Sequence, residues 1–465
     1  MTDPLTSDLG RRTELRSLAR ESLERLQFKR LSEMLSRIVS ENTFYRQKFV
    51  EAGLLKASGA QKINLPRDRT ELAKLSFTTK NELIGDGSSP FAANLTWPVD
   101  DYVRFHRTSG TQGHPMMVLD TAEDWQWWIE GWQHVLDVAQ VTAADRAVMA
   151  FSFGPFIGFW SAFDATAARG AMVIPTGAMT TLARLDLIQS SSATVVFCTP
   201  SYALHMAELA AENGIDIGDS SVTRIIVAGE PGGSIPATRR RIESAWDAKV
   251  VDHSGASEIG PWGFADEQGT GIYVNEARFL PELISIEDGQ VIPFGSVPLR
   301  SYASKGAAEN DGATAEGLAE LVLTTLGRDG SPVIRYRTGD LVRPMINDMS
   351  DDGCQFLFLD GGVLGRTDDM MIIRGVNVFP TSVESILREI PEVVEYRMTA
   401  TKAGQMDQLK IELEATAKVA DVVSELLNTR LGLRIEVSQV VDGELPRFEA
   451  KGKRFIDLRD QLLKS

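Results

Sequence analysis

The stretch RTSGTQGHP, residues 107–115, combines three hydroxyl side chains with two glycines and lies between two apolar segments. Glycine lets the backbone approach a ligand closely, and clustered N–H and hydroxyl donors suit phosphate oxygens. A plain surface turn has a similar composition, so this stretch alone leaves a phosphate-binding loop and a turn as equal alternatives. It is not a Walker loop, because the pattern GxxxxGK followed by Ser or Thr occurs nowhere in the chain.

Three further stretches place charged residues beside glycines and hydroxyls: SGASE (254–258), YRTGD (336–340) and GRTDDMMIIRGVNVFPTSVE (365–384). Each charged residue also has a simpler interpretation. Glu258 could be a solvated surface residue, and Asp340 could cap its own turn. Lys451, in LPRFEAKGKRF, could belong to a solvated charge run. Taken together, the four stretches favour the phosphate-binding alternative.

The composition is that of an ordinary globular protein, with 43% apolar and 24% charged residues. The net charge of -16 argues against a general binder of nucleic acids or anionic membranes. Two cysteines far apart in sequence exclude a disulfide framework and fit a reducing compartment. We find neither a secretory signal layout nor the roughly 20 apolar residues that a spanning helix needs. We therefore expect a soluble, cytoplasmic protein with no nucleic-acid or membrane partner.

The elements that must position these residues begin with helices over residues 12–50, where Leu31, Met34, Leu35 and Ile38 have the spacing of one helix face. Between about 145 and 258, short apolar runs alternate with helix-like segments. This alternation predicts βαβ units and a parallel sheet that is buried on both faces. Ligands of such sheets lie outside the C-terminal ends of the strands, where CTPS, AGEPGG and HSGASE fall.

From about 270 to 345 the pattern changes to strands and turns, including a hairpin between LAELVLTTL and PVIRYRTGDLV. The last hundred residues predict a short hairpin that leads into a helix and then a ββαβ unit. We place a domain boundary near Asp368. The predicted fold class is α/β, with a large N-terminal domain (1–367) of parallel α/β sheets plus a β subdomain, and a small α+β C-terminal domain (368–465).

These motifs resemble the adenylate-forming superfamily of acyl-CoA synthetases and adenylation domains, and within it the phenylacetate–CoA ligase family. The segments LQFKRLSEMLSRIVSENTFYRQKFVEAG, LSFTTKNEL and VRFHRTSGTQGHP match the opening of that family in order and spacing. The resemblance covers nearly the whole chain. It implies ATP- and Mg²⁺-dependent activation of a carboxylic acid as an acyl-adenylate, followed by transfer to coenzyme A with release of AMP and pyrophosphate.

The resemblance also implies roles for individual residues. The phosphate loop would bind the β- and γ-phosphates, Glu258 would help bind Mg²⁺, and Lys451 would hold the carboxylate and the α-phosphate. Asp340 would accept hydrogen bonds from the ribose, with Arg366 nearby. The catalytic residues are then Lys451, Glu258 and Thr108; the other nucleotide-binding residues are Ser109, Gly110, Thr111, Gln112, Gly113, Gly229, Glu230, Pro231, Asp252, His253, Ser254, Asp340 and Arg366.

For the acyl group, aromatic residues clustered with glycines could form the wall of a flat apolar pocket, although core packing would explain each of them as well. The expected pocket residues are Phe151, Phe153, Phe156, Gly158, Gly255, Ala256, Pro261 and Trp262. The resemblance favours an aromatic acid. It also implies a mobile C-terminal domain that turns at Asp368 between the two half-reactions.

The sequence departs from the family pattern at several positions. His114 stands where the loop commonly carries lysine, Ser254 replaces a tyrosine that stacks on adenine, and Ala450 replaces a glycine. Some relatives carry a cysteine-based zinc site after the Glu258 motif, but no cysteine follows it here within residues 259–279. We therefore predict no structural zinc.

Two alternatives remain open from the sequence. The same adenylate could pass to the phosphopantetheine of a carrier protein or to an amine, since neither acceptor needs the basic patch that CoA requires. A catalytically silent, nucleotide-binding regulatory protein is the second alternative, although the presence of Glu258, Asp340 and Lys451 argues against it. A homodimer is the default expectation for the oligomeric state.

Overall fold

The computed structural model describes residues 9–55, 64–85, 87, 89–108, 115–300, 317–347, 353–369, 371–373, 376–403, 406–447 and 454–459. Within this part of the chain, no helix is both long enough and apolar enough to cross a membrane.

The N-terminal segment forms three helices, α1 (Leu9–Arg16), α2 (Arg20–Ile38) and α3 (Thr43–Glu51). The apolar face that the spacing predicts on α2 is buried. Where the sequence suggested helix throughout residues 12–50, Asn42 interrupts it, because its side chain accepts a hydrogen bond from Tyr45 N and caps a new helix. Two short helices follow, α4 (Arg69–Leu72) and α5 (Lys80–Ile84).

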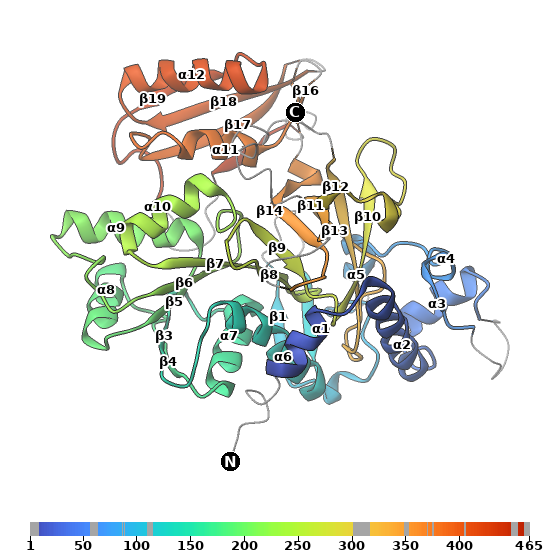
Figure 1. Cartoon of the computed structure of the whole chain (residues 1–465). Coiled ribbons are helices and arrows are strands. Elements are labelled where there is room, and N and C mark those ends of the chain that lie inside the picture. The colour runs from blue at the N-terminus through green and yellow to red at the C-terminus, as the bar shows by residue number, and fades with distance from the viewer. Residues whose placement is uncertain are drawn as a thin grey trace.

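The predicted parallel sheet is present. Its strands are β3 (Arg146–Met149), β4 (Met172–Pro175), β5 (Val195–Cys198), β6 (Arg224–Val227) and β7 (Lys249–Ala256), in the order β7-β6-β5-β3-β4. The helices between and before them are α6 (Ala122–Val138), α7 (Ile157–Ala168), α8 (Thr181–Ser190), α9 (Pro200–Glu212) and α10 (Pro236–Trp246). Figure 1 shows them on both sides of these strands.

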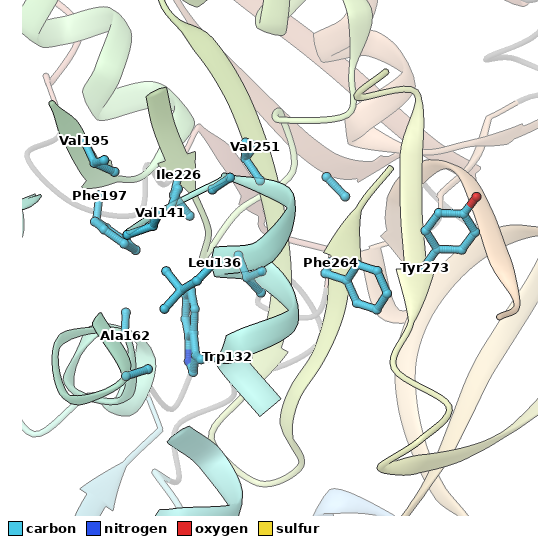
Figure 2. Packing of buried hydrophobic residues seen from close by; sticks show 14 of the residues in the cluster. Trp132, Leu136, Val141, Ala162, Val195, Phe197, Ile226, Val251, Phe264 and Tyr273 are labelled. Atoms are coloured by element: carbon cyan, nitrogen blue, oxygen red, sulfur yellow. The ribbon is translucent and has the colours of Figure 1, made fainter. Parts of the chain in front are cut away.

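Burial on both faces explains the continuous apolar runs of these strands. Val195 and Phe197 pack with α6 and α7, while Val196 and Cys198, which alternate with them, pack with α8, α9 and α10. Figure 2 shows the first of these clusters, in which Trp132 of α6 lies against Phe197 and near Val251 of β7. The helix that carries Trp132 is therefore fixed against the strand that leads to Glu258.

The sequence predicted a β subdomain for the second half of the large domain. Its strands continue the parallel sheet instead of forming one of their own, because β7 pairs on its other edge with antiparallel β8. Seven strands continue the sheet to a total of 12: β8 (Gly260–Ala265), β9 (Gly271–Val274), β10 (Phe279–Ser285), β11 (Leu299–Arg300), β12 (Ala319–Thr325), β13 (Tyr336–Asn347) and β14 (Phe358–Arg366). The predicted hairpin is the antiparallel pair of β12 and β13. Short 3-10 turns cover Val99–Asp101 and Phe294–Ser296.

A small hairpin, β1 (Arg104–Arg107) and β2 (Met117–Asp120), flanks the phosphate-loop stretch, as its apolar neighbours predicted. After the 3-10 turn Thr367–Asp369, the chain forms the hairpin β15 (Met371–Ile373) and β16 (Val376–Val378) and then the helix α11 (Pro380–Arg388). The predicted ββαβ unit follows as β17 (Glu395–Ala403), β18 (Met406–Glu414), α12 (Ala417–Leu431) and β19 (Glu436–Val440), and β20 (Phe455–Asp457) completes the sheet.

This four-stranded sheet, ordered β19-β18-β17-β20, has its own apolar core, which contains Met371, Val383, Leu387, Ile411 and Leu413. Figure 1 shows it as a layer of its own, and its helix α11 contacts α10 and β14 of the large domain. The α/β fold class with a small α+β C-terminal unit is therefore confirmed.

Candidate active site

The phosphate-loop stretch is closed by hydrogen bonds at its base. Thr108 N donates to Met116 O at 3.0 Å, and Met116 N donates to Thr108 Oγ1 at 2.9 Å, so the two strand ends are clamped together. Thr108 is buried. Ser109, Gly110, Thr111, Gln112, Gly113 and His114 lie outside the described residues, and so does Lys451. Their roles remain predictions.

Glu258, directly after β7, is a buried carboxylate with two donors. Lys80 Nζ lies 3.0 Å from its Oε1, and the Tyr336 hydroxyl donates to the same oxygen at 3.1 Å. Burial raises the pKa of Glu258, but the charge of Lys80 and these hydrogen bonds outweigh it and hold the pKa below its ordinary value. Glu258 is therefore ionised. An ionised carboxylate of this kind fits a hard cation such as Mg²⁺.

Lys80 and Tyr336 are held in place by the backbone. Thr78 forms a parallel bridge with Tyr336, in which Thr78 N donates to Arg335 O at 2.8 Å and Arg337 N donates to Thr78 O at 2.9 Å. Thr79 then begins α5 with a capping box, so that Lys80 is the first residue of a helix anchored to β13. Lys80 and Tyr336, which both contact Glu258, are thus held by the same backbone bridge.

A fully buried ion pair holds the backbone of Glu258. Arg328 Nη1 donates to Glu258 O at 2.8 Å, and its Nε donates to Asp120 Oδ1 at 2.8 Å. Trp128 Nε1 also donates to Asp120, at 3.1 Å. Because Asp120 ends β2, these bonds connect the strand that leaves the phosphate loop to the residue that would bind the metal.

Asp340 and Arg366 are register partners on β13 and β14, and Arg366 Nη1 lies 3.0 Å from Asp340 Oδ1. Gly339 before them has a φ of +73°, and a Cβ there would stand 2.7 Å from Arg366 Nη2. The left-handed backbone at this position therefore favours glycine. The Asp368 carboxylate lies 3.7 Å from Arg366 on the other side.

Asp252, His253 and Ser254, near the end of β7, were all expected to bind the nucleotide, but their side chains do not lie on one face of the strand. Asp252 points towards α10, where Ser234 Oγ donates to its Oδ2 at 2.7 Å, and burial raises its pKa to about 6. Ser254 is half-buried. Because side chains alternate along a strand, His253 points to the opposite face, where its ring packs on Trp132 at 4.0 Å between centroids. The structure therefore does not place His253 beside Asp252.

The end of β6 lies beside Asp252, since Val227 is the register partner of Asp252. Gly229 follows with a φ of +94°, and Glu230 accepts a hydrogen bond from Ser201 N at 2.8 Å, which ties the turn to the start of α9. Pro231 is half-buried. The predicted adenine-binding turn thus stands at the edge of the sheet where the sequence placed it.

The expected pocket residues divide into two groups. Phe151 is buried with its ring 5.0 Å from that of Phe153, whereas Phe156 and Gly158 are exposed. Trp262 is fully buried in a different apolar cluster, and Pro261 is buried too, whereas Gly255 is exposed and Ala256 is half-buried. Core packing therefore explains Trp262, and the exposed glycines and Phe156 are better placed to meet a ligand.

Sequence reasoning missed Lys80, Tyr336 and Arg328. Lys80 lies 178 residues from Glu258, and no periodic pattern joins the two. The only local signal was a lysine at the start of a helix capped by Thr79 and Glu82. Among the described residues, no group of three or more His, Cys, Asp or Glu side chains could hold a metal ion, and the expected lack of zinc stays a prediction.

Comparison with known proteins supports the family that the motifs suggested. Residues 29–278 match the family model of the AMP-binding enzymes, and residues 375–459 match that of the AMP-binding enzyme C-terminal domain. The chain is 29% identical over 474 residues to the phenylacetate-coenzyme A ligase of Thermus thermophilus, covering 96% of this chain and 99% of the relative. It is 30% identical over 400 residues to that of Aromatoleum evansii, covering 85% and 82%.

Solved structures agree on the fold. A 2-hydroxyisobutyryl-CoA ligase in its postadenylation state superimposes with a TM-score of 0.83 at 23% identity, covering 97% of this chain and 92% of the ligase. In its thioesterification state the same ligase gives 0.67 at 24% identity, covering 97% and 94%. The overall arrangement of this chain is thus nearer the postadenylation arrangement. The chain belongs to the AMP-binding enzymes, and it is an AMP-forming acid–CoA ligase similar to the phenylacetate–CoA ligases.

Proposed function

We propose that this ligase acts on an aromatic carboxylic acid, aryl or arylacetic, using Mg·ATP in the first half-reaction and CoA in the second. The observation that carries the first half-reaction is the Glu258 cradle, in which a buried carboxylate is kept ionised by Lys80 and Tyr336. The names of the related phenylacetate-coenzyme A ligases support the aromatic acid. Clustered Phe151 and Phe153 beside exposed Phe156 agree with it.

The first half-reaction brings two anions together, because a carboxylate attacks the α-phosphorus of ATP. Catalysis of such a step depends on position and on neutralising charge, and it needs no general base on the enzyme. Bound Mg²⁺ would neutralise phosphate charge. In our proposal Glu258 holds the metal, the loop from Ser109 to Gly113 cradles the β- and γ-phosphates, and Lys451 contacts the carboxylate and the α-phosphate.

The ribose and adenine fit the other edge of the site. Asp340 can accept two hydrogen bonds from the ribose, and Arg366 lies beside it to meet the α-phosphate. We assign Asp252, Ser254 and the turn Gly229–Pro231 to the adenine side, because they share the C-terminal edge of β6 and β7. We further propose that residues 368–465 turn about Asp368 so that a thiolate can attack the adenylate.

Pyrophosphate release across a panel of aromatic and aliphatic acids, with and without CoA, tests this function. We expect release with aryl or arylacetic acids, and thioester only when CoA is added. Adenylate formation without thioester would indicate a carrier-protein or amine acceptor. Preference for aliphatic acids would contradict the proposed substrate class, and no release with any acid would indicate a silent nucleotide-binding protein.

A further inference from the structure

His253 is a buried histidine whose Nδ1 contacts a carbonyl oxygen, while its Nε2 has no partner among the described residues. It is 5% exposed, and its Nδ1 lies 2.7 Å from Gly263 O. No described residue donates a hydrogen bond to its Nε2. The ring packs on Trp132, but the only donor of that side chain, Nε1, is used by Ser161 Oγ at 2.8 Å.

The contact with Gly263 fixes the chemical form of the ring. A carbonyl oxygen accepts hydrogen bonds, so Nδ1 carries the proton and donates it to Gly263 O. Burial lowers the pKa of His253 to about 4, so the imidazole is neutral near pH 7. In this tautomer Nε2 has a lone pair and no hydrogen. It can only accept a hydrogen bond.

His253 Nε2 lies beside Gly255, two residues further along β7. A Cβ added to Gly255 would stand 3.2 Å from His253 Nε2, so this atom borders the space that the missing side chain leaves. Gly255 is itself exposed, whereas residues 250–253 of the strand are buried. Asp252 and the adenine turn lie on the opposite face of β7. The Nε2 atom therefore faces the side of the strand away from the nucleotide.

We propose that His253 Nε2 accepts a hydrogen bond from a hydroxyl group on the acyl substrate, and that this ligase selects a hydroxylated aromatic acid over its unsubstituted parent. The assignment rests on the proposed aromatic acid function. It moves His253 from the nucleotide to the acyl group. An enclosed acceptor is costly when a bound acid cannot supply a donor, so a site built this way rejects the acid that lacks the hydroxyl.

The test compares adenylation kcat/KM for matched acids. Phenylacetic acid and benzoic acid are each assayed beside their ring-hydroxylated derivatives. Mandelic acid serves as the α-hydroxylated form of phenylacetic acid. The methoxy counterpart of each hydroxylated acid is assayed as well. We expect one hydroxylated isomer to exceed its parent by about 10-fold or more. Its methoxy counterpart should fall below the parent, because the methoxy oxygen has no hydrogen to donate.

The variant His253→Leu should reduce the ratio of hydroxylated to parent acid to near one, whereas His253→Gln, which keeps an acceptor at about the same reach, should retain most of it. Loss of stability alone would lower both acids together and leave the ratio unchanged. The proposal is overturned if no hydroxylated acid exceeds its parent, or if His253→Leu keeps the wild-type ratio. Failure to adenylate any aromatic acid would instead contradict the proposed function.

Discussion

Two ion pairs lie at the candidate active site, and they differ in how the rest of the chain supports them. In the Lys80–Glu258 pair the Glu258 side chain is 10% exposed, and the pair joins residues 178 positions apart through a backbone bridge. In the Arg366–Asp340 pair the exposed fractions are similar, 44% for Arg366 against 36% for Lys80, and the partners are register neighbours on β13 and β14. The first pair is held by α5 and by the Tyr336 hydroxyl, and the second lies next to the proposed pivot.

The difference indicates which half of the site is preformed. Lys80 and Tyr336 contact the Glu258 carboxylate, and Arg328 donates to its carbonyl oxygen. Glu258 is therefore committed to one geometry before any ligand binds. Arg366, which also lies 3.7 Å from the Asp368 carboxylate, can change partners at little cost. We expect substitutions in the Lys80–Glu258 pair to affect the adenylation step more than those in the Arg366–Asp340 pair.

The largest effect is expected for Glu258→Gln. Glutamine can still accept hydrogen bonds from Lys80 and Tyr336, so the fold should persist, but the negative charge for the cation is lost. Adenylation should fall by about 10²–10³-fold, the usual loss when one aligned electrostatic group is removed from a site. ATP–pyrophosphate exchange measures this, with a thermal melt as the control. Exchange within a few-fold of wild type would exclude Glu258 as the metal ligand.

The next prediction concerns the pivot beside the Arg366–Asp340 pair. Asp368→Pro fixes φ near -65° and should restrict the turn of the C-terminal domain. The described arrangement is nearer the postadenylation than the thioesterification state of a related fold, so adenylate formation should be nearly normal. Thioester formation should fall by about 10²-fold, because misplacement of about 1 Å already costs that much.

Quenched-flow assays of the two half-reactions measure this effect, and the adenylate should accumulate. A thermal melt shows whether proline has unfolded the junction. A stably folded Asp368→Pro with both half-reactions at wild-type rates would place the pivot elsewhere. Equal loss in both half-reactions would indicate that the junction serves the nucleotide rather than the domain motion.

The sequence predicted the elements of both regions better than their contacts. Apolar runs separated by helical patterns identified β3 to β7, and the motifs identified Glu258, Asp340 and Arg366. Neither signal shows that β7 continues antiparallel into β8, because pairing on a second strand edge leaves no local pattern. Lys80 was missed because its partner is distant in sequence. The separation of His253 from Asp252 was available from the two-residue period of a strand, but the motif grouped them.

Lys80→Met should have the third largest effect. Its charge is the main influence opposing the rise that burial imposes on the Glu258 pKa, so without it that pKa moves upward. Adenylation should fall by about 10-fold at neutral pH, as expected for a lost charge-assisted hydrogen bond. A depressed carboxylate pKa keeps the charged form as pH falls, and a raised one loses it sooner. The acid limb of the rate profile should therefore move to higher pH in the variant.

The matched control is Lys29→Met, which removes a lysine from the exposed Lys29–Glu33 pair on α2. It should leave both the rate and the acid limb unchanged, because exposed helix pairs contribute little. If Lys80→Met lowers the rate but leaves the acid limb in place, Lys80 supports the fold without setting the charge of Glu258.

The smallest effect is expected for Arg366→Lys. The substitution keeps the positive charge but loses the forked geometry that reaches both Asp340 and Asp368. Since water screens this pair, it is worth at most about 1 kcal/mol, and the KM for ATP should rise no more than about 5-fold. The rise should shrink further when the assay is repeated at high ionic strength, because salt screens exposed charges more than buried ones. The loss in Lys80→Met should persist under the same conditions. If Arg366→Lys costs as much as Lys80→Met and is equally insensitive to salt, then the Arg366 side of the site is as rigid as the Glu258 cradle.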